Sequence, residues 1–240
     1  MKRIGHKGAH LIEAGNTLAS FEVARAIGVD MIEFDVLRHD GRLVIAHDPH
    51  DAIERDGGSL MTLEAGLDHL ATADYDEIGL DVDMKHRGFE LELADALARR
   101  GLIERTTITT MHESSLALIR AHDPEVRIGL TIPFVTRDWL SAPAIVRPLL
   151  AGGILYHRLR QPARVERMLL AGEIDAVMAF HAVVTKRLVD VVHRAGGELF
   201  SWTVDDERTI MRLADLGVDG IVSNDPRLFE SLREAVAATA

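Results

Sequence analysis

Short apolar runs alternate along the chain with segments whose apolar residues recur at helical spacing. The apolar runs predict eight β-strands, near residues 2–6, 30–36, 78–84, 106–111, 126–132, 174–179, 197–203 and 219–223. The helical spacing predicts helices near residues 17–28, 62–71, 90–101, 114–122, 144–151, 162–171, 185–195, 206–216 and 226–237. Eight strands alternating with helices within 240 residues favour an α/β fold, a single-domain (β/α)8 TIM barrel over residues 1–240. An open doubly wound sheet is the alternative, because strand order alone does not show closure.

One short link interrupts this alternation. The dipeptide Asp40-Gly41 separates two apolar runs, which is a strong signal for a β-hairpin. The link is too short for a parallel crossover, so the second run must fold back as a hairpin extension after the second strand. A two-residue loop places Asp35 opposite Ala46, whereas a three-residue loop or a bulge places His47 opposite Asp35.

Acidic residues occupy alternate positions of the second predicted strand. Because successive strand side chains point to opposite faces, Glu33 and Asp35 share one face and the apolar residues take the other. In a barrel both carboxylates would point inward at the C-terminal mouth, where their mutual repulsion favours a bound divalent cation. Mg²⁺ and Ca²⁺ are hard cations that prefer oxygen ligands. The alternative is that one of the acids pairs with an arginine or a lysine.

The third predicted strand repeats this pattern, with Asp81, Asp83 and Lys85 on one face. Asp83 is therefore a candidate third metal ligand, and Lys85 could hold a phosphate oxygen as a point charge. The alternative is a plain ion pair between Asp83 and Lys85 at the end of the strand.

Two histidines flank the acidic pair in the sequence, and imidazole exchanges protons near neutral pH. His6 ends the first predicted strand, and the hairpin returns His47 to within one residue of the level of Asp35. One ring could remove a proton from an attacking hydroxyl while the other protonates the leaving oxygen. Trp202, at the end of the seventh strand, either walls a substrate pocket or packs into the core.

The charge balance restricts the partners. The chain has 27 Lys and Arg against 38 Asp and Glu, and its net charge of −11 argues against nucleic-acid binding. A local cationic pocket for one phosphate is compatible with that charge, so we expect a small-molecule partner. The absence of cysteine excludes disulfides, thiolate zinc sites and thiol nucleophiles. No transmembrane segment and no apolar leader are apparent, so a cytoplasmic location is expected. The oligomeric state stays open.

Several short motifs follow one another in a fixed order. They read His6-Lys7-Gly8, Ala14-Gly15-Asn16-Thr17, Glu33-Phe34-Asp35-Val36, Asp40-Gly41, His47-Asp48, Asp83-Met84-Lys85, Trp202-Thr203-Val204 and Gly217-Val218-Asp219-Gly220-Ile221. Each motif is weak by itself. The ordered set, which covers nearly the whole chain, resembles the glycerophosphodiester phosphodiesterase family of phospholipase-C-like barrel phosphodiesterases.

This resemblance implies a TIM barrel, acid/base roles for His6 and His47, and phosphate contacts from Lys7 and Lys85. The divalent metal, Mg²⁺ or Ca²⁺, would be held by Glu33, Asp35 and Asp83. In the reaction that the resemblance implies, a neighbouring hydroxyl of the substrate attacks phosphorus, and the cyclic phosphate that forms is then hydrolysed.

The chain departs from the family's motifs at four places. Lys7 stands where the family has Arg, Gly15 where it has Glu, and Asp83 where it has a second Glu. In addition, 35 residues separate His47 from Asp83, where the family usually inserts a longer segment that forms a small cap. The short segment and the Asp-x-Lys motif resemble the sphingomyelinase D-like branch of the superfamily, which acts on choline lysolipids.

The first hypothesis is therefore metal-dependent hydrolysis of glycerophosphodiesters, to glycerol phosphate and an alcohol, by two-histidine acid/base catalysis. One alternative is a sphingomyelinase D-like or lysophospholipase D-like phosphodiesterase. Another is a barrel that binds phosphoesters without turnover, motivated by the altered motifs at Lys7 and Gly15. A third is an unrelated metal-dependent barrel enzyme such as an aldolase, favoured if His6 lies more than ~10 Å from the carboxylates, beyond the reach of direct proton transfer.

Overall fold

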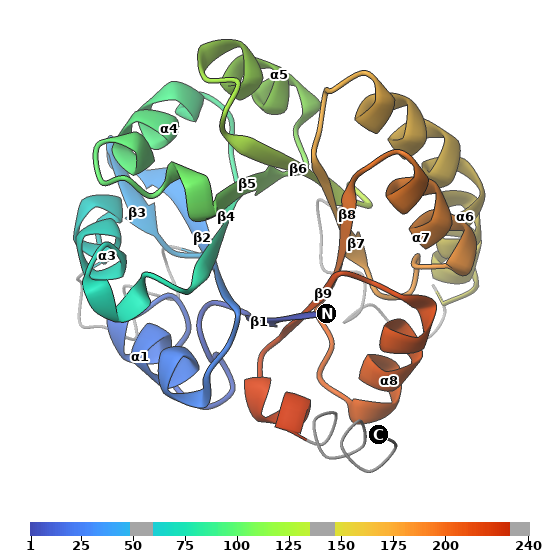
Figure 1. Cartoon of the computed structure of the whole chain (residues 1–240), viewed down its shortest axis with the longest axis horizontal. Helices are drawn as coiled ribbons and strands as arrows, with labels where there is room; N and C mark the ends of the chain where they lie inside the picture. Colours follow the sequence, from blue (N-terminus) through green and yellow to red (C-terminus); the bar gives the residue numbers. More distant parts are fainter. Residues whose placement is uncertain (49–59, 135–146, 231–240) are drawn as a thin grey trace.

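Parallel strands close into a barrel in a computed structural model that describes residues 1–48, 60–134 and 147–230 (Figure 1). The barrel strands are β1 (Lys2–Gly5), β2 (Met31–His39), β4 (Gly79–Met84), β5 (Thr106–Thr110), β6 (Arg127–Ile132), β7 (Ala176–Phe180), β8 (Glu198–Trp202) and β9 (Gly220–Ser223). They pair in the order β1-β9-β8-β7-β6-β5-β4-β2, and parallel pairing of β1 with β2 closes the ring. The expected TIM barrel is confirmed, and the open-sheet alternative is excluded.

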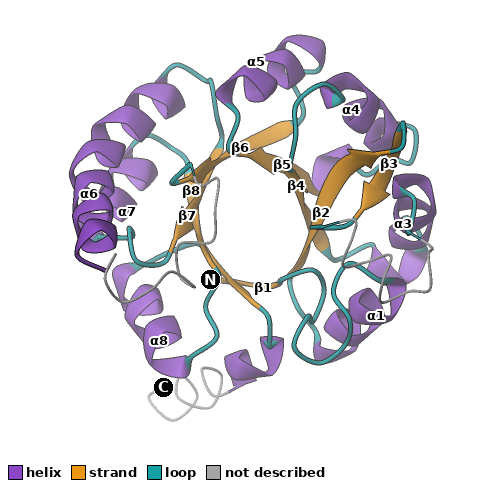
Figure 2. Ribbon diagram, turned by 180° about the vertical axis from the view of Figure 1, so that it is seen from behind, coloured by secondary structure: helices purple, strands orange, loops and turns teal. Residues whose placement is uncertain are grey.

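Helices surround the barrel on its outer side (Figure 2). They are α1 (Leu18–Ile27), α3 (Leu63–Leu70), α4 (Glu90–Ala98), α5 (Glu113–His122), α6 (Arg147–Leu170), α7 (Lys186–Arg194) and α8 (Glu207–Leu216), with short 3₁₀ turns η1 (Ala73–Tyr75), η2 (Ile103–Arg105) and η4 (Pro226–Phe229). The hydroxyls of Thr17, Thr62 and Thr185 each accept the backbone N–H of the third residue of the helix that follows, in α1, α3 and α7. Of the helix expected near 226–237, the first residues form η4, and residues 231–240 lie outside the described ranges.

Helix α6 is continuous, which corrects the expectation of two helices near 144–151 and 162–171. Pro162 lies inside it and removes one backbone hydrogen bond. Packing against α7 outweighs this local cost, because tertiary contacts routinely override helix propensity. None of the helices in the described ranges combines the length and the apolar character that crossing a membrane requires.

The hairpin forms as the Asp40-Gly41 dipeptide predicts. Strand β3 (Arg42–Ile45) runs antiparallel to the outer end of β2, and the backbone N–H of Ala46 donates to the Asp35 carbonyl at 3.1 Å. Both turn residues have positive φ, 47° at Asp40 and 77° at Gly41, as a type I′ turn requires. The two-residue loop is therefore the alternative that the chain adopts.

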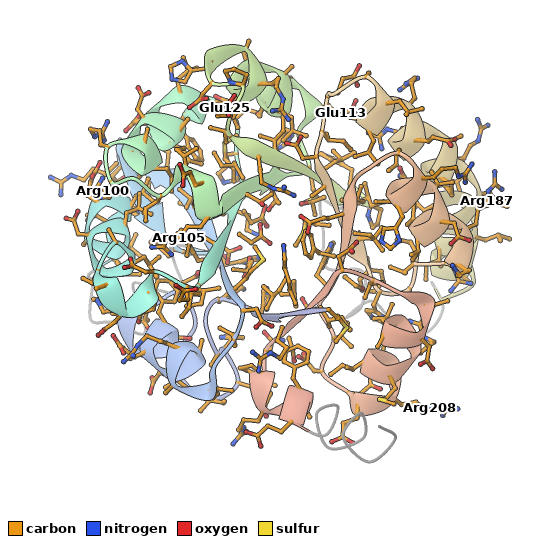
Figure 3. All side chains as sticks on the ribbon, viewed as in Figure 1. Arg100, Arg105, Glu113, Glu125, Arg187 and Arg208 are labelled. Atoms are coloured by element: carbon orange, nitrogen blue, oxygen red, sulfur yellow. The ribbon has the colours of Figure 1, made fainter. Side chains whose placement is uncertain are left out.

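Alternation along the strands separates two apolar clusters. Outward residues such as Ile32, Phe34 and Val82 pack with the helices in the main core. A smaller cluster lies inside the barrel and comprises Ile4, Met31, Ala176, Met178, Phe200 and Val222. Beyond the first inward pair of β2 and β4, which is Met31 and Gly79, the inward positions of these two strands carry acids, namely Glu33, Asp35, Asp81 and Asp83. Figure 3 shows side chains from the strands reaching into the centre of the ring.

Candidate active site

Three carboxylates come together where β2 and β4 end. Asp35 and Asp83 are partners in the register of the two strands, and Glu33 lies one inward position earlier on β2. One carboxylate oxygen from each residue lies within 4.8 Å of the others. Glu33 and Asp35 are buried, and Asp83 is half-buried. Three carboxylates form a hard oxygen donor set, so these residues fit a Mg²⁺ or Ca²⁺ ion.

Asp35 is fully buried and is held by three partners. Asn16 Nδ2 donates to Asp35 Oδ2 at 2.8 Å. Lys85 Nζ lies 2.6 Å from Oδ1 and Lys7 Nζ lies 3.6 Å from Oδ2. Burial alone would raise the pKa of Asp35, but Lys85 and Lys7 lower it below its ordinary value. Asp35 is therefore ionised at neutral pH.

Lys85 bridges two of the three carboxylates. In addition to its contact with Asp35, its Nζ donates to Asp83 Oδ2 at 2.5 Å. Burial alone would lower the pKa of Lys85, but Asp35 and Asp83 raise it above its ordinary value. The ion pair that the sequence offers as an alternative to a metal site is thus present, and it uses the same carboxylates as the metal site would.

Glu33 is the carboxylate nearest to His6. Its Oε2 accepts the backbone N–H of Lys7 at 2.8 Å and lies 3.8 Å from His6 Nε2. Burial raises the pKa of Glu33 well above its ordinary value, and the charge of Asp35 adds to this effect. The Glu33 carboxyl group is therefore favoured in its protonated form, or in its ionised form when a cation neutralises it.

A chain of hydrogen bonds orients the His6 ring. Asp205 accepts both the side-chain amide of Asn224, at 2.6 Å, and its backbone N–H, at 2.8 Å. The Asn224 Oδ1 atom therefore faces His6, and it lies 2.5 Å from His6 Nδ1. Because an amide oxygen can only accept, Nδ1 carries the ring proton and Nε2 carries the lone pair. Burial lowers the pKa of His6 to about 4, with Lys7 adding to this effect, so the ring is neutral at pH 7.

His47 follows β3 directly after Ala46, and the expected return of the hairpin toward Asp35 is seen. The His47 side chain is exposed, yet enough protein surrounds it that desolvation lowers its pKa. The charge of Asp35 opposes this shift, and the charges of Lys85 and Lys7 add to it. The charge of Asp35 therefore contributes to the pKa of both His6 and His47.

Asp81 lies deeper in the barrel, beside Glu33 in the register of β4 and β2. Its Oδ1 accepts the hydroxyl of Thr109 at 2.7 Å, and its buried Oδ2 has no hydrogen-bond partner within the described parts of the chain. Burial raises the pKa of Asp81 to about 7. Asp81 is outside the group of three possible metal ligands.

Trp202 ends β8, and Figure 1 shows β8 across the barrel from β2 and β4, the strands that carry the carboxylates. Its ring packs against the apolar cluster inside the barrel, and its Nε1 donates to the carbonyl of Met178 at 3.0 Å. The Phe180 ring lies 5.5 Å away, between centroids. Trp202 stays half-exposed, so it packs on the core and also leaves ring surface uncovered.

Gly15, one of the departures from the family's motifs, touches the phosphate-binding candidate Lys7. A Cβ atom at Gly15 would lie 2.6 Å from His10 Nδ1 and 2.9 Å from Lys7 Cβ. A side chain there would displace His10, whose ring meets that of His6 edge to face at 6.4 Å. A glutamate at position 15 is therefore incompatible with the present position of the His10 side chain.

Three residues of the site were missed by the sequence reasoning. Asn16 holds Asp35 from a backbone with positive φ, and its place in the Asn16-Thr17 motif was the available signal. Asn224 lies in the polar segment after the last strand, which the sequence places at the mouth, but its hydrogen bond to His6 was not predicted. Nothing in the sequence pattern points to Asp205. The His6–Glu33 distance of 3.8 Å removes the motivation for an unrelated barrel enzyme.

Comparison with known proteins gives one consistent result. The model of the Glycerophosphoryl diester phosphodiesterase family matches residues 5–78 and 50–228. A glycerophosphodiester phosphodiesterase from Caldanaerobacter subterraneus subsp. tengcongensis is 26% identical over 261 residues, covering 95% of this chain and 96% of that protein.

Solved structures agree on the fold. A glycerophosphodiester phosphodiesterase structure from Parabacteroides distasonis superposes with a TM-score of 0.73 at 20% identity, covering 98% of this chain and 98% of that one. A phosphodiesterase from Oleispira antarctica, solved in complex with the product sn-glycerol-3-phosphate, gives a TM-score of 0.70 at 20% identity and covers 98% and 97% of the two chains.

Proposed function

The chain belongs to the glycerophosphoryl diester phosphodiesterase family, a family of phosphoric diester hydrolases, and from that premise we propose that it hydrolyses glycerophosphodiesters to glycerol phosphate and an alcohol. The observation that carries the proposal is the convergence of three carboxylates, two ammonium groups and the His6 ring at the mouth. The product sn-glycerol-3-phosphate in the Oleispira antarctica structure supports a small-molecule substrate of this class.

In this proposal Glu33, Asp35 and Asp83 hold a divalent cation, Mg²⁺ or Ca²⁺. The bound cation supplies Lewis-acid stabilisation of the negative charge on the phosphoryl oxygens. With it present, the ionised carboxylates and the ammonium groups of Lys7 and Lys85 leave one net positive charge. That charge matches the single negative charge of a phosphodiester.

Lys7 and Lys85 then bind the phosphate as point charges, since neither offers the paired N–H groups of an arginine. Both ammonium groups already lie beside Asp35, at 3.6 and 2.6 Å. Trp202 forms the opposite wall and meets the apolar part of the substrate.

The two histidines divide the proton transfers. His6 Nε2, which carries a lone pair, removes the proton of the glycerol hydroxyl as that oxygen attacks phosphorus. The bond from phosphorus to the alcohol oxygen breaks, and His47, which enters this step as the protonated imidazolium, gives that oxygen its proton. Water then opens the cyclic phosphate, with His47 taking a proton from the water and His6 returning one to the glycerol oxygen. Each ring ends in its starting state.

A lysolipid phosphodiesterase is the second candidate. It is favoured by the short segment between His47 and Asp83, because a mouth without the family's longer insertion leaves room for an acyl chain. A barrel that binds phosphoesters without turnover is the third candidate. The cytoplasmic location stays a prediction of the sequence, which cell fractionation tests.

The decisive assay measures hydrolysis of glycerophosphocholine, glycerophosphoethanolamine and lysophosphatidylcholine, with and without EDTA, followed by addition of Mg²⁺ or Ca²⁺. We expect EDTA to abolish activity and one of the two cations to restore it. His6→Ala and His47→Ala should each lower kcat/KM by about 10²–10⁴-fold, the usual contribution of a general acid or base.

His39→Ala is the matched control, because His39 lies on the same hairpin and pairs with Asp40 at its tip. It should leave kcat/KM unchanged. Activity that survives both EDTA and the His47→Ala change would contradict the mechanism. Binding of sn-glycerol-3-phosphate without hydrolysis of any substrate would favour the non-catalytic barrel.

A further inference from the structure

Helix α6 is far longer than the other helices around the barrel, with 24 residues against 8 to 10 in α1, α3, α4, α5, α7 and α8. Figure 1 shows it on the outside of the barrel beside α7. It begins after β6 and ends before β7, so its N-terminal half belongs to the side of the barrel where the strands end. That is also the side of the candidate active site.

Two contacts fix this placement. Arg158 Nε donates to the carbonyl of Ala182, at 2.9 Å, in the loop that follows β7. Arg164 pairs with Glu113, the first residue of α5, which lies where α5 and α6 come together in Figure 3. Both partners follow the C-terminal end of a strand, so the segment around residues 151–160 lies beside the mouth.

This segment has two unlike faces. Gln161 and Val165 are buried and Ile154 is half-buried, so this face rests on the barrel. Leu155 and Leu159 are 57% and 60% exposed, and Tyr156 between them is 56% exposed. At about 100° per residue, Leu155, Tyr156 and Leu159 span only about 100° of the helix, opposite the buried face. We call these three residues the apolar stripe.

The charged residues that this part of α6 itself contributes are all positive. Residues 139–165 contain no Asp or Glu, although the chain has 38 of them in 240 residues. Arg158 and Arg160 are exposed and flank the stripe on its two sides, and the Arg160 guanidinium lies 5.9 Å from the centre of the Tyr156 ring. A cationic strip therefore lies beside the mouth of an otherwise acidic protein.

We propose that the apolar stripe docks the protein onto an anionic lipid surface, with the mouth beside the bilayer. Leucine and tyrosine side chains flanked by arginines are the pattern of a helix that lies in the interface plane. The arginines attract anionic headgroups, while their apolar stems pack along the lipid. A second copy of the chain fits less well, because a two-fold contact through the stripe would bring like-charged arginines together.

This docking deepens the proposed function, on which it rests, by naming the source of the substrate. A phosphodiester that stays anchored in a lipid layer by one acyl chain would reach the mouth without leaving the surface. The expected preferred substrates are therefore lysophospholipids in vesicles, and water-soluble glycerophosphodiesters are handled without the stripe.

The test uses the full-length protein and flotation with two kinds of vesicle, one of phosphatidylcholine alone and one containing about 30% phosphatidylglycerol, an anionic fraction at which basic interfacial segments bind. The variant is Leu155→Glu with Leu159→Glu, and the matched control is Leu118→Glu with Leu170→Glu, two exposed leucines away from the stripe. We expect the wild type and the control to bind the anionic vesicles, with less binding at high salt. The stripe variant should bind at least about tenfold less, because two leucines no longer enter the interface.

Activity separates failure of the docking from failure of the proposed function. All three proteins should hydrolyse dissolved glycerophosphocholine equally, while the stripe variant alone loses activity on lysophosphatidylglycerol held in vesicles. Binding that is absent in the wild type, or equal in the stripe variant, overturns the docking whatever the activity. A dimer in light scattering that the stripe variant dissociates, without vesicle binding, would assign the stripe to a second copy instead. Absence of hydrolysis by every protein, with stripe-dependent binding intact, would refute the proposed function alone.

Discussion

The two sides of the barrel interior have opposite chemistry, although the same strand geometry builds both. On β2 and β4 the inward positions carry Glu33, Asp35, Asp81 and Asp83. On β7, β8 and β9 they carry Ala176, Met178, Phe200 and Val222, which form an apolar cluster with Ile4 and Met31. The acidic side contains an uncompensated inward group, the Asp81 oxygen without a partner, whereas the unpartnered hydroxyl of β8, Ser201, alternates with the inward residue Phe200.

The difference shows where stability and chemistry reside. Close-packed apolar side chains stabilise the fold by burial, which repays their ordering. Buried carboxylates cost free energy unless cations neutralise them, so they persist where they serve a function. We therefore expect substitutions on the acidic side to change activity and metal binding, and substitutions on the apolar side to change the free energy of unfolding.

The largest loss of activity should come from Asp35→Asn, a substitution on the acidic side of the barrel interior. The change keeps the shape of the side chain but removes the charge that meets Lys85, Lys7 and the proposed cation. We expect kcat/KM to fall on the order of 10⁴-fold, because several kcal/mol of charge stabilisation depend on the bound ion. Calorimetric titration with Mg²⁺ and Ca²⁺ should show the matching loss of affinity. Asp40→Asn, at the exposed hairpin tip, is the control and should change neither quantity.

The sequence alone predicts the part of this site that local strand and turn patterns determine, and it does not predict the contacts made between distant segments. Strand alternation is enough to place Glu33, Asp35 and Asp83 on inward positions, and the Asp-Gly turn is enough to return His47 toward them. The hydrogen bond from His6 to Asn224 joins residues 218 positions apart along the chain, and only closure of the barrel brings His6 to Asn224 and its partner Asp205. Local patterns contain no information about such contacts.

The second largest effect tests the apolar side. Phe200 is 1% exposed within the inner cluster, and Phe200→Ala should lower the free energy of unfolding by about 3–5 kcal/mol. The folded fraction should keep its kcat/KM within about twofold, since Phe200 is outside the carboxylate cluster. Urea unfolding provides the measurement, and Phe200→Leu serves where the alanine variant does not fold. Phe134→Ala, at an exposed phenylalanine, is the control and should cost less than about 0.5 kcal/mol. Equal losses in the two variants would contradict the comparison.

Lys85→Met should have a smaller effect, which lowers kcat/KM but strengthens metal binding. Loss of the ammonium removes the proposed phosphate contact, so kcat/KM should fall by about 10²-fold. The same loss frees Asp35 and Asp83 from their ion pairs, so Mg²⁺ or Ca²⁺ should bind about tenfold more tightly in calorimetry. Lys7→Met should show the weaker shift in metal affinity, since its ammonium lies 3.6 Å from Asp35. Weaker metal binding in Lys85→Met would show that Lys85 does not compete for these carboxylates.

The smallest expected effect depends on pH and comes from Asp81→Asn. Burial raises the pKa of Asp81 to about 7, so between about pH 4 and pH 7 the folded state holds a proton that the unfolded state has released. The stability contributed by this proton is fully present below that window and is lost as the pH rises through it. His6 acts in the opposite direction, because its lowered pKa of about 4 makes stability fall as the pH drops from about 6.5. The two contributions oppose each other, so the pH dependence of wild-type stability does not reveal either of them separately.

The difference between Asp81→Asn and the wild type isolates the contribution of Asp81. In urea unfolding with EDTA, the wild type should lose about 2–3 kcal/mol relative to the variant between about pH 5 and pH 7. Thr109→Val is the matched control for the hydrogen bond, since it removes the donor to Asp81 without removing the carboxyl group. Parallel stability curves for wild type and Asp81→Asn would mean that Asp81 releases its proton at the same pH in both states. Burying the ionised carboxylate of Asp81 would then cost the folded state no free energy.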